Sequence, residues 1–289
     1  MEPHIAVLVL DTPFGSVAEE FGDFGDNAKD LLKDSKLPLV KYYIAYDLDK
    51  PEQQDVTDST LENLREYVDS GVVKGIVLTG SRSDAFDNEN PWIQSTDKFL
   101  KFLIANKPGF PMVGFCFGHQ ILAKNLGSKV NRNTNENGWE CGITTISLNK
   151  SILSVEKSPF VDTLDTEDGN VLEHINLVEF HRDIVYGLPP TSNASSNSLA
   201  SQTTFQSIGS TNKCSIQGLV TESGPVKVLT FQGHPEYSTR YALKLLELTH
   251  SIGMIDKATF DRSSYKTNNL INHGPVIANV VLKFFEAHS

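Results

Sequence analysis

The chain has 289 residues, of which 39% are hydrophobic, and a formal net charge of −11 at pH 7. This length and apolar content allow a sizeable buried core, in one large α/β domain or two small ones. The negative charge excludes nucleic acids and anionic membrane surfaces as expected partners, because their phosphates would repel the chain, and it favours a small molecule or another protein.

The chain carries no targeting or disulfide signal. Met1 to Leu10 lacks a basic segment, its apolar run is too short for a signal peptide, and no later stretch could span a bilayer. The three cysteines, Cys116, Cys141 and Cys214, are odd in number and have no zinc-site spacing, which predicts reduced thiols. We therefore expect a cytoplasmic protein.

Strand and helix signals alternate over the first half of the chain. Continuous apolar runs predict strands buried on both faces, and apolar residues three or four apart predict helices. Asp11 to Gly25 is expected to be a loop. The alternation predicts right-handed βαβ units and a doubly wound, mostly parallel sheet. The expected strands are Ile5 to Leu10, Leu39 to Tyr46, Val73 to Leu78 and Pro111 to Phe115, and the expected helices are Asn27 to Lys33, Thr60 to Asp69, Pro91 to Asn106 and one that begins at Phe117.

The pattern changes after Gly127, where strands follow one another with few helices between them. This predicts antiparallel strands added to the same sheet. No linker divides the chain, so we expect a single domain over residues 1–289, with a polar surface loop at about residues 190–212. The strands expected here are Gly142 to Leu148, Val171 to Val178, Ile216 to Thr221 and Lys227 to Phe231, and the closing helices are Ser238 to Ser251 and Val276 to Ala287.

The stretch MVGFCFGHQ, from Met112 to Gln120, predicts a sharp strand–turn–helix with Cys116 at the turn. Gly114 and Gly118 suit such a turn, because a Cβ there would clash with neighbouring elements. A helix N-terminus favours the thiolate over the thiol, so Cys116 is a candidate nucleophile. The alternative is that Cys116 is a small buried core residue.

A cysteine nucleophile needs a histidine, and two of the eight histidines have a carboxylate two residues later. These are His181-Arg182-Asp183 and His234-Pro235-Glu236, and residues two apart in extended chain point to the same side. Pro235 favours an extended His234 at the carboxyl end of a buried strand, which is the sheet edge where the elbow lies. We therefore prefer His234 with Glu236. A Cys-x-x-His metal site through His119 is disfavoured, because only two ligands are local.

The elbow motif GFCFGHQ, followed 118 positions after the cysteine by HPE, resembles the class I (triad) glutamine amidotransferases. It is most similar to the stand-alone, GMP-synthase-like fungal and plant members that include the γ-glutamyl peptidases. The resemblance covers nearly the whole chain and implies a flavodoxin-like doubly wound fold that needs no metal or cofactor. It implies Cys116 as nucleophile, His234 as general base and acid, Glu236 as the group orienting His234, the backbone of Gly80 and Phe117 as the oxyanion hole, and Gln120, Ser81 and His181 as substrate-binding residues.

The reaction this resemblance implies is hydrolysis of a γ-glutamyl amide, in glutamine or a γ-glutamyl peptide, through a γ-glutamyl thioester on Cys116. No synthase domain that would use ammonia is recognised in the chain. One alternative is therefore an ammonia-donating subunit whose acceptor domain is another protein. A second is a non-enzymatic, redox-sensing protein built on the elbow cysteine. A sensor has no need of His234 and Glu236, which argues against the second.

Overall fold

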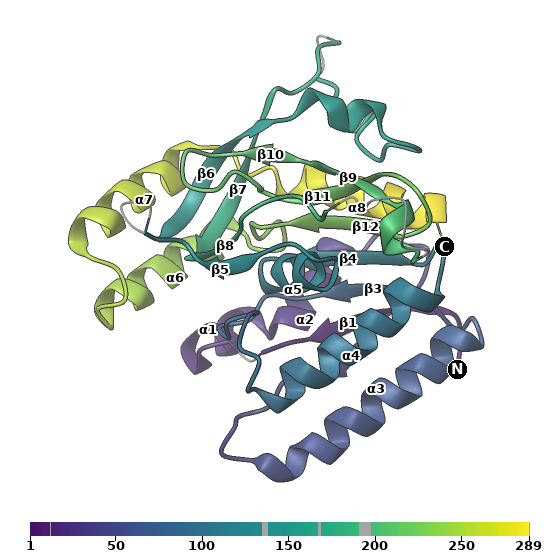
Figure 1. Ribbon diagram of the computed structural model, residues 1–289. Helices are drawn as coiled ribbons and strands as arrows, with labels where there is room; N and C mark the ends of the chain where they lie inside the picture. Colours follow the sequence, from purple (N-terminus) through teal and green to yellow (C-terminus); the bar gives the residue numbers. More distant parts are fainter. Residues whose placement is uncertain (12, 135–137, 167–168, 191–197, 289) are drawn as a thin grey trace.

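The largest sheet of the computed structural model has seven strands in the order β2-β1-β3-β4-β12-β11-β9 (Figure 1). The structure describes residues 1–289 except 12, 135–137, 167–168, 191–197 and 289. The first five strands are parallel, in the order of flavodoxin-like folds, and β11 and β9 extend the sheet by antiparallel pairing. The strands are β1 (His4–Val9), β2 (Leu39–Tyr43), β3 (Val73–Leu78), β4 (Pro111–Phe115), β9 (Thr204–Ser207), β11 (Leu219–Ser223) and β12 (Lys227–Phe231).

Helices cover both faces of this sheet, which makes it doubly wound as predicted. In β1, Ala6 and Leu8 belong to the core on one face, while Ile5 and Val7 belong to the core on the other. A strand buried on both faces has no polar side, which is why its sequence is a continuous apolar run. The first face is covered by α3 (Gln54–Asp69), α4 (Pro91–Asn106) and α5 (Phe117–Asn125), and the second by α2 (Phe24–Leu31) and α8 (Gly274–His288).

A second, three-stranded sheet in the order β10-β6-β7 lies beside the first (Figure 1). It consists of β10 (Gly209–Ser210), β6 (Glu140–Leu148) and β7 (His174–His181), and β5 (Val130–Arg132) pairs with β8 (Asp183–Val185) next to it. The helices α6 (Thr239–Ser251) and α7 (Lys257–Asn269) pack on β6, and α1 (Gly15–Phe21) packs on α6. Within the described ranges, short 3-10 helices span Pro51–Gln53, Lys150–Ser154 and Ala200–Gln202. Among the described helices, none is long and apolar enough to cross a bilayer.

Two expectations about the second half of the chain are wrong. The strands predicted at Gly142 to Leu148 and Val171 to Val178 pair with each other in the second sheet instead of joining the first. Local alternation indicates that a segment is a strand, but it does not specify which strand it pairs with. Of the predicted surface loop, residues 191–197 lie outside the described residues, and β9 and β10 form within the rest. β9 is an edge strand that buries Phe205 between polar neighbours, so it needs no apolar run.

Two helices were not predicted at all. The helix α1 lies in the expected loop and buries a single residue, Val17. The helix α7 buries only the small polar residues Ser263 and Thr267. In α1 the apolar residues at helical spacing, Val17, Ala18 and Phe21, extend over only seven residues, and α7 has no apolar stripe, so the signal that identifies an amphipathic helix is short in one and missing in the other.

The close packing of α5 against β3 gives a stability prediction. A Cβ added to Gly118 would contact the backbone carbonyl of Leu78 and lie 2.8 Å from its Cβ. Because a strand backbone cannot yield as a flexible side chain can, we expect Gly118→Ala to lower the free energy of unfolding by about 1–3 kcal/mol in urea denaturation. At Gly187 an added Cβ meets nothing within 4 Å, so Gly187→Ala is the matched control. Equal stability of the two variants would contradict this account of the elbow.

Candidate active site

Cys116 lies between the end of β4 and the start of α5, in a backbone conformation that L-residues rarely adopt, with φ 50° and ψ −102°. Its amide donates to the carbonyl of Phe231 at 2.9 Å, which fixes the turn against β12. Such strain costs on the order of 1–3 kcal/mol and is typical of functional sites. The predicted strand–turn–helix is confirmed, and its cysteine is at the turn.

His234 and Glu236 meet as the sequence predicted. Nδ1 of His234 lies 2.8 Å from Oε1 of Glu236, and the side chains are 5% and 1% exposed. The imidazole also lies near the thiol of Cys116, since a Cβ on Gly80 would meet both side chains. Burial lowers the pKa of His234, but the negative charges of Cys116 and Glu236 and hydrogen bonds to both outweigh it and raise this pKa to about 10. His234 is therefore favoured as an imidazolium at neutral pH, next to the carboxylate of Glu236.

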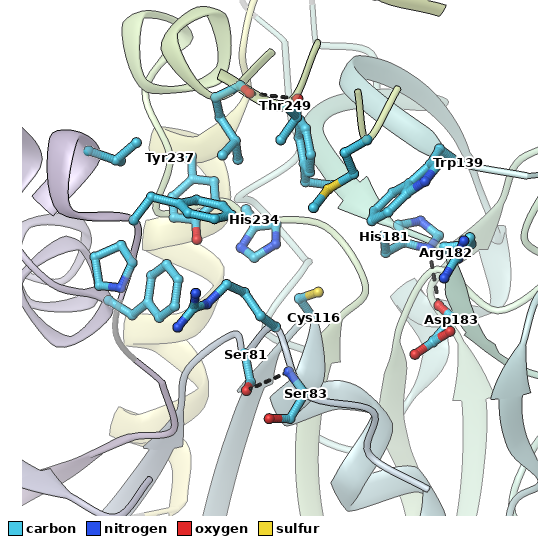
Figure 2. Close-up of a pocket in the computed structure, with 18 of the residues that line it drawn as sticks. Ser81, Ser83, Cys116, Trp139, His181, Arg182, Asp183, His234, Tyr237 and Thr249 are labelled. Atoms are coloured by element: carbon cyan, nitrogen blue, oxygen red, sulfur yellow. Dashed lines mark hydrogen bonds between the residues drawn. The ribbon is translucent and has the colours of Figure 1, made fainter. Parts of the chain in front are cut away.

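Two aromatic rings hold the imidazole in place, and the sequence analysis missed their role. The ring of His234 stacks on Tyr237 at 4.1 Å between centroids, and Tyr237 stacks on Tyr241 at 3.9 Å. Tyr237 comes three residues after His234 in a tight turn. This spacing of a histidine and a tyrosine was the only feature of the sequence that could have indicated the stack. The stack restricts rotation of the imidazole and keeps its edge toward Cys116 (Figure 2).

The predicted oxyanion hole consists of the backbone amides of Gly80 and Phe117. Among the described residues, neither the amide of Gly80 nor that of Phe117 donates a hydrogen bond, although the adjacent Gly118 amide donates to Thr79. A Cβ on Gly80 would lie 2.9 Å from Cε1 of His234 and 3.8 Å from the Cβ of Cys116. Gly80 thus lies directly beside both side chains, and only glycine leaves the imidazole its space.

Two glutamine side chains form a series of contacts that leads from the Cys116 sulfur into the protein interior. Gln232 Nε2 lies 3.7 Å from the Cys116 sulfur, and Gln120 Nε2 donates to Gln232 Oε1 at 3.2 Å and to the carbonyl of Asp183 at 3.0 Å. Gln120 was predicted here, and Gln232 was not, because the sequence analysis treated it only as part of a turn. Ser81, another predicted substrate-binding residue, lines the same pocket.

His181 lies in the pocket wall, but its ring nitrogens are already used. Nδ1 donates to the carbonyl of Asp183 at 3.1 Å, while Nε2 lies 3.0 Å from Glu140 and 3.2 Å from Glu179. Burial lowers the pKa of His181, but hydrogen bonds and charges of the two glutamates raise it to about 10. Because both ring nitrogens have partners, His181 has none left for a direct substrate contact. We therefore assign His181 a structural role in the pocket wall.

The pocket that contains Cys116 has a volume of about 170 Å³ and is mainly apolar. Its lining joins segments that are distant in sequence: the first loop and α1, the elbow, the ends of β7 and β12, and α6 (Figure 2). The aromatic residues in this lining were not foreseen, because their segments carry no shared motif. They are Phe14, Phe24, Trp139, Phe180, Tyr237 and Tyr241.

The geometry does not support a metal site that includes His119. His119 is fully buried in the core, where Nδ1 lies 2.7 Å from the hydroxyl of Thr230, and burial lowers its pKa to about 3. Within the described parts of the chain, three potential ligands gather only at Glu140, Glu179 and His181. His119 is not one of these residues, and the His181 nitrogen in that group lies 3.0 and 3.2 Å from the two carboxylates as an ion-pair partner.

Comparison with known proteins gives one consistent family. A family model described as "Glutamine amidotransferase class-I" matches residues 56–248. A Saccharomyces cerevisiae protein whose name assigns it provisionally to the glutamine amidotransferases is 30% identical, over 97% of this chain and 96% of its own. Gamma-glutamyl peptidase 2 of Arabidopsis thaliana is 26% identical over 70% of this chain and 66% of its own.

More distant similarities extend the same pattern. A glutamine-hydrolysing GMP synthase of Wigglesworthia glossinidia brevipalpis is 24% identical over 73% of this chain, which spans 33% of that relative. Among solved structures, a glutamine amidotransferase from Thermotoga maritima superposes with a TM-score of 0.60 at 17% identity, over 98% of this chain and 99% of its own. At this identity the superposition shows the fold.

The environments of the three cysteines predict selective alkylation. Burial raises the pKa of Cys141 to about 12 and also raises that of Cys214, and neither lines the pocket. Cys116 opens into the pocket beside a protonated imidazole, so iodoacetamide at pH 7 should label it at least about tenfold faster than the other two. Peptide mass spectrometry over time measures the rates, and denatured protein, in which all three should react alike, is the control. Comparable labelling of Cys141 or Cys214 in the folded protein would overturn the assignment.

Proposed function

Because the chain belongs to the class-I glutamine amidotransferase family, we propose that it hydrolyses a γ-glutamyl amide bond, in glutamine or in a γ-glutamyl peptide. The proposed catalytic residues are Cys116, His234 and Glu236. The observation that carries the proposal is the 2.8 Å contact between His234 and Glu236 beside a strained elbow cysteine that opens into the same pocket. This is the nucleophile–base–orienting arrangement that acyl transfer requires.

In the proposed reaction, the Cys116 thiolate attacks the amide carbon and forms a tetrahedral intermediate. The amides of Gly80 and Phe117 donate to its oxyanion, and losing one such donor typically costs about 10²–10³ in rate. His234 gives its proton to the departing amine, which leaves a γ-glutamyl thioester on Cys116. The same imidazole then takes a proton from water as water attacks the thioester, and glutamate and the thiolate are released. The proton that His234 gives to the amine is thus replaced by the proton that it takes from water.

The pocket supports a leaving group larger than ammonia. Tyr237, which stacks on His234, and Tyr241, which stacks on Tyr237, line the pocket and offer apolar surface to an amine substituent. A gamma-glutamyl peptidase is among the relatives. An amine that leaves as part of a peptide needs no protected route to a second site, so a γ-glutamyl peptide or small conjugate is the proposed substrate class.

A second candidate is an ammonia-donating subunit that works with a separate acceptor protein. The similarity to a glutamine-hydrolysing GMP synthase favours it. The chemistry at Cys116 would be the same, and the difference lies in the fate of the amine. A redox-sensing role is less well supported, since sensing by a thiol makes no use of an imidazole oriented by a carboxylate.

Removing the proposed base tests the triad. His234→Ala should lower kcat by about 10²–10⁴, because the leaving amine loses its acid and water loses its base. Glu236→Ala should lower kcat by a smaller factor, because the imidazole remains but loses its orientation. His174, which is exposed on β7, provides the control as His174→Ala. Steady-state kinetics on a γ-glutamyl dipeptide measure the effects, and a His234→Ala variant with near wild-type kcat would refute the pairing.

The substrate class is tested by direct competition between leaving groups. We expect kcat/KM for a γ-glutamyl dipeptide to exceed that for glutamine by at least about tenfold, or about 1.4 kcal/mol of transition-state preference. Released amine, ammonia and glutamate are measured for each substrate. Faster turnover of glutamine, particularly if a second protein stimulates it, would support the ammonia-donating subunit instead.

A further inference from the structure

Glu179, near the end of β7, is a fully buried carboxylate that the mechanism above does not use. It does not line the pocket that contains Cys116. Neither of its oxygens accepts a hydrogen bond from the residues that the structure describes, although Nε2 of His181 lies 3.2 Å from Oε2. Burying an ionised carboxylate without hydrogen bonds is costly, so a nearby positive charge must offset the cost.

His181 cannot balance Glu179 alone, because its Nε2 also lies 3.0 Å from Glu140. Burial raises the pKa of Glu140, but the hydrogen bond with His181 and the charge of its imidazolium outweigh burial and lower this pKa. The pKa of His181 is about 10, so at neutral pH one imidazolium lies between two carboxyl groups of which Glu140 is ionised. When Glu179 is ionised too, this group of three carries one excess negative charge.

Titratable groups reach this cluster from three further segments of the chain. Cys214, which precedes β11, remains a neutral thiol, because burial raises its pKa. His119 of α5 remains a neutral imidazole, because burial lowers its pKa to about 3. The third group is His234, after β12, and its positive charge acts to lower the pKa of Glu179. Of these three groups, only His234 can supply the positive charge that balances Glu179.

The backbone of Gly233 lies against the carboxylate of Glu179, and His234 is the next residue. A Cβ added to Gly233 would contact Oε1 of Glu179 and lie 3.0 Å from its carboxyl carbon. The amide of His234 donates to the carbonyl of Val178 at 2.7 Å, and Val178 immediately precedes Glu179. This hydrogen bond fixes the carboxylate relative to the imidazole. Since both side chains are buried, their charges are poorly screened by solvent.

We propose that Glu179 is a second carboxylate for His234, whose buried charge acts across Gly233 to stabilise the imidazolium that protonates the departing amine. This inference rests on the proposed function. Glu236 orients the imidazole by direct contact, whereas Glu179 is a positioning residue that acts through His234 and does not reach the pocket. Burial raises the pKa of Glu179 to about 7. Below that pH Glu179 takes up a proton, and His234 becomes a stronger acid because it loses the stabilising charge.

A pH titration of the histidine ring resonances by NMR tests the inference without turnover. The His234 resonance, assigned by its loss in His234→Ala, should show a small inflection near pH 7, where Glu179 titrates, besides its own step at higher pH. Glu179→Gln, which keeps the shape of the side chain, should remove the inflection and lower the His234 step by about one pH unit. A wild-type curve without the inflection would overturn the inference, even if Glu179→Gln failed to fold.

Two control variants separate this charge effect from structural support. Glu140→Gln removes the other carboxylate beside His181, and it should move the His181 step further than the His234 step. Asp97, at 14% side-chain exposure, pairs with Lys124 at 2.8 Å outside the pocket, so Asp97→Asn should leave both steps in place. If Glu140→Gln or Asp97→Asn moved the His234 step as far as Glu179→Gln does, the effect would be structural and the inference would be wrong.

The pH dependence of kcat for a γ-glutamyl dipeptide measures the same effect during the reaction. The alkaline limb, where His234 loses its proton, should lie about one pH unit lower in Glu179→Gln than in the wild-type protein. A uniform loss of kcat with the limb in its wild-type position would make Glu179 a structural residue and overturn the inference. If the wild-type protein hydrolysed neither the dipeptide nor glutamine, the proposed function itself would fail, and the NMR titration would still decide whether Glu179 stabilises the imidazolium.

Discussion

The hydrogen bond from the amide of His234 to the carbonyl of Val178, at 2.7 Å, is where the two sheets of this protein meet. On one side is the parallel sheet, which carries Cys116 at the end of β4. On the other is β7, which leads to Asp183. The site therefore depends on the docking of two separate layers, and a displacement of the second sheet would separate the imidazole from the sulfur. Gly233 makes this approach possible, because an added Cβ would meet the carboxylate of Glu179.

Buried charge supports the same junction. Glu179 is fully buried, and burial raises its pKa to about 7 despite the positive charge of His181, whose Nε2 lies 3.2 Å away. Glu140 shares His181 and also accepts from Gln217 at 2.8 Å. An imidazolium between two carboxylates carries a large desolvation cost that close contacts must offset, so such groups tolerate little displacement. We interpret the cluster of Glu140, Glu179 and His181 as a rigid part of the structure that supports the pocket wall.

The pocket thus has two chemically different sides around one sulfur. The side of His234 is aromatic, and its stacked rings orient the imidazole while leaving apolar surface for a departing amine. The side of Asp183 is charged and hydrogen-bonded through Gln120.

The sequence by itself determined the elements whose signals are local: the buried parallel strands, the amphipathic helices α4 and α8, the elbow at Cys116, and the His234-Pro235-Glu236 turn. Only the tertiary structure decided which strands share a sheet, because the alternation of apolar and polar residues along a strand does not specify its pairing partner. It also decided that His181 is enclosed by Glu140 and Glu179, and that Arg132, Asp84 and Asp183 converge. These residues belong to segments that are distant in the sequence and come together only on folding. The charge state of a buried side chain depends on its burial, which no sequence pattern encodes. The polar helix α7 was missed for a related reason, since its contacts are made by small polar side chains.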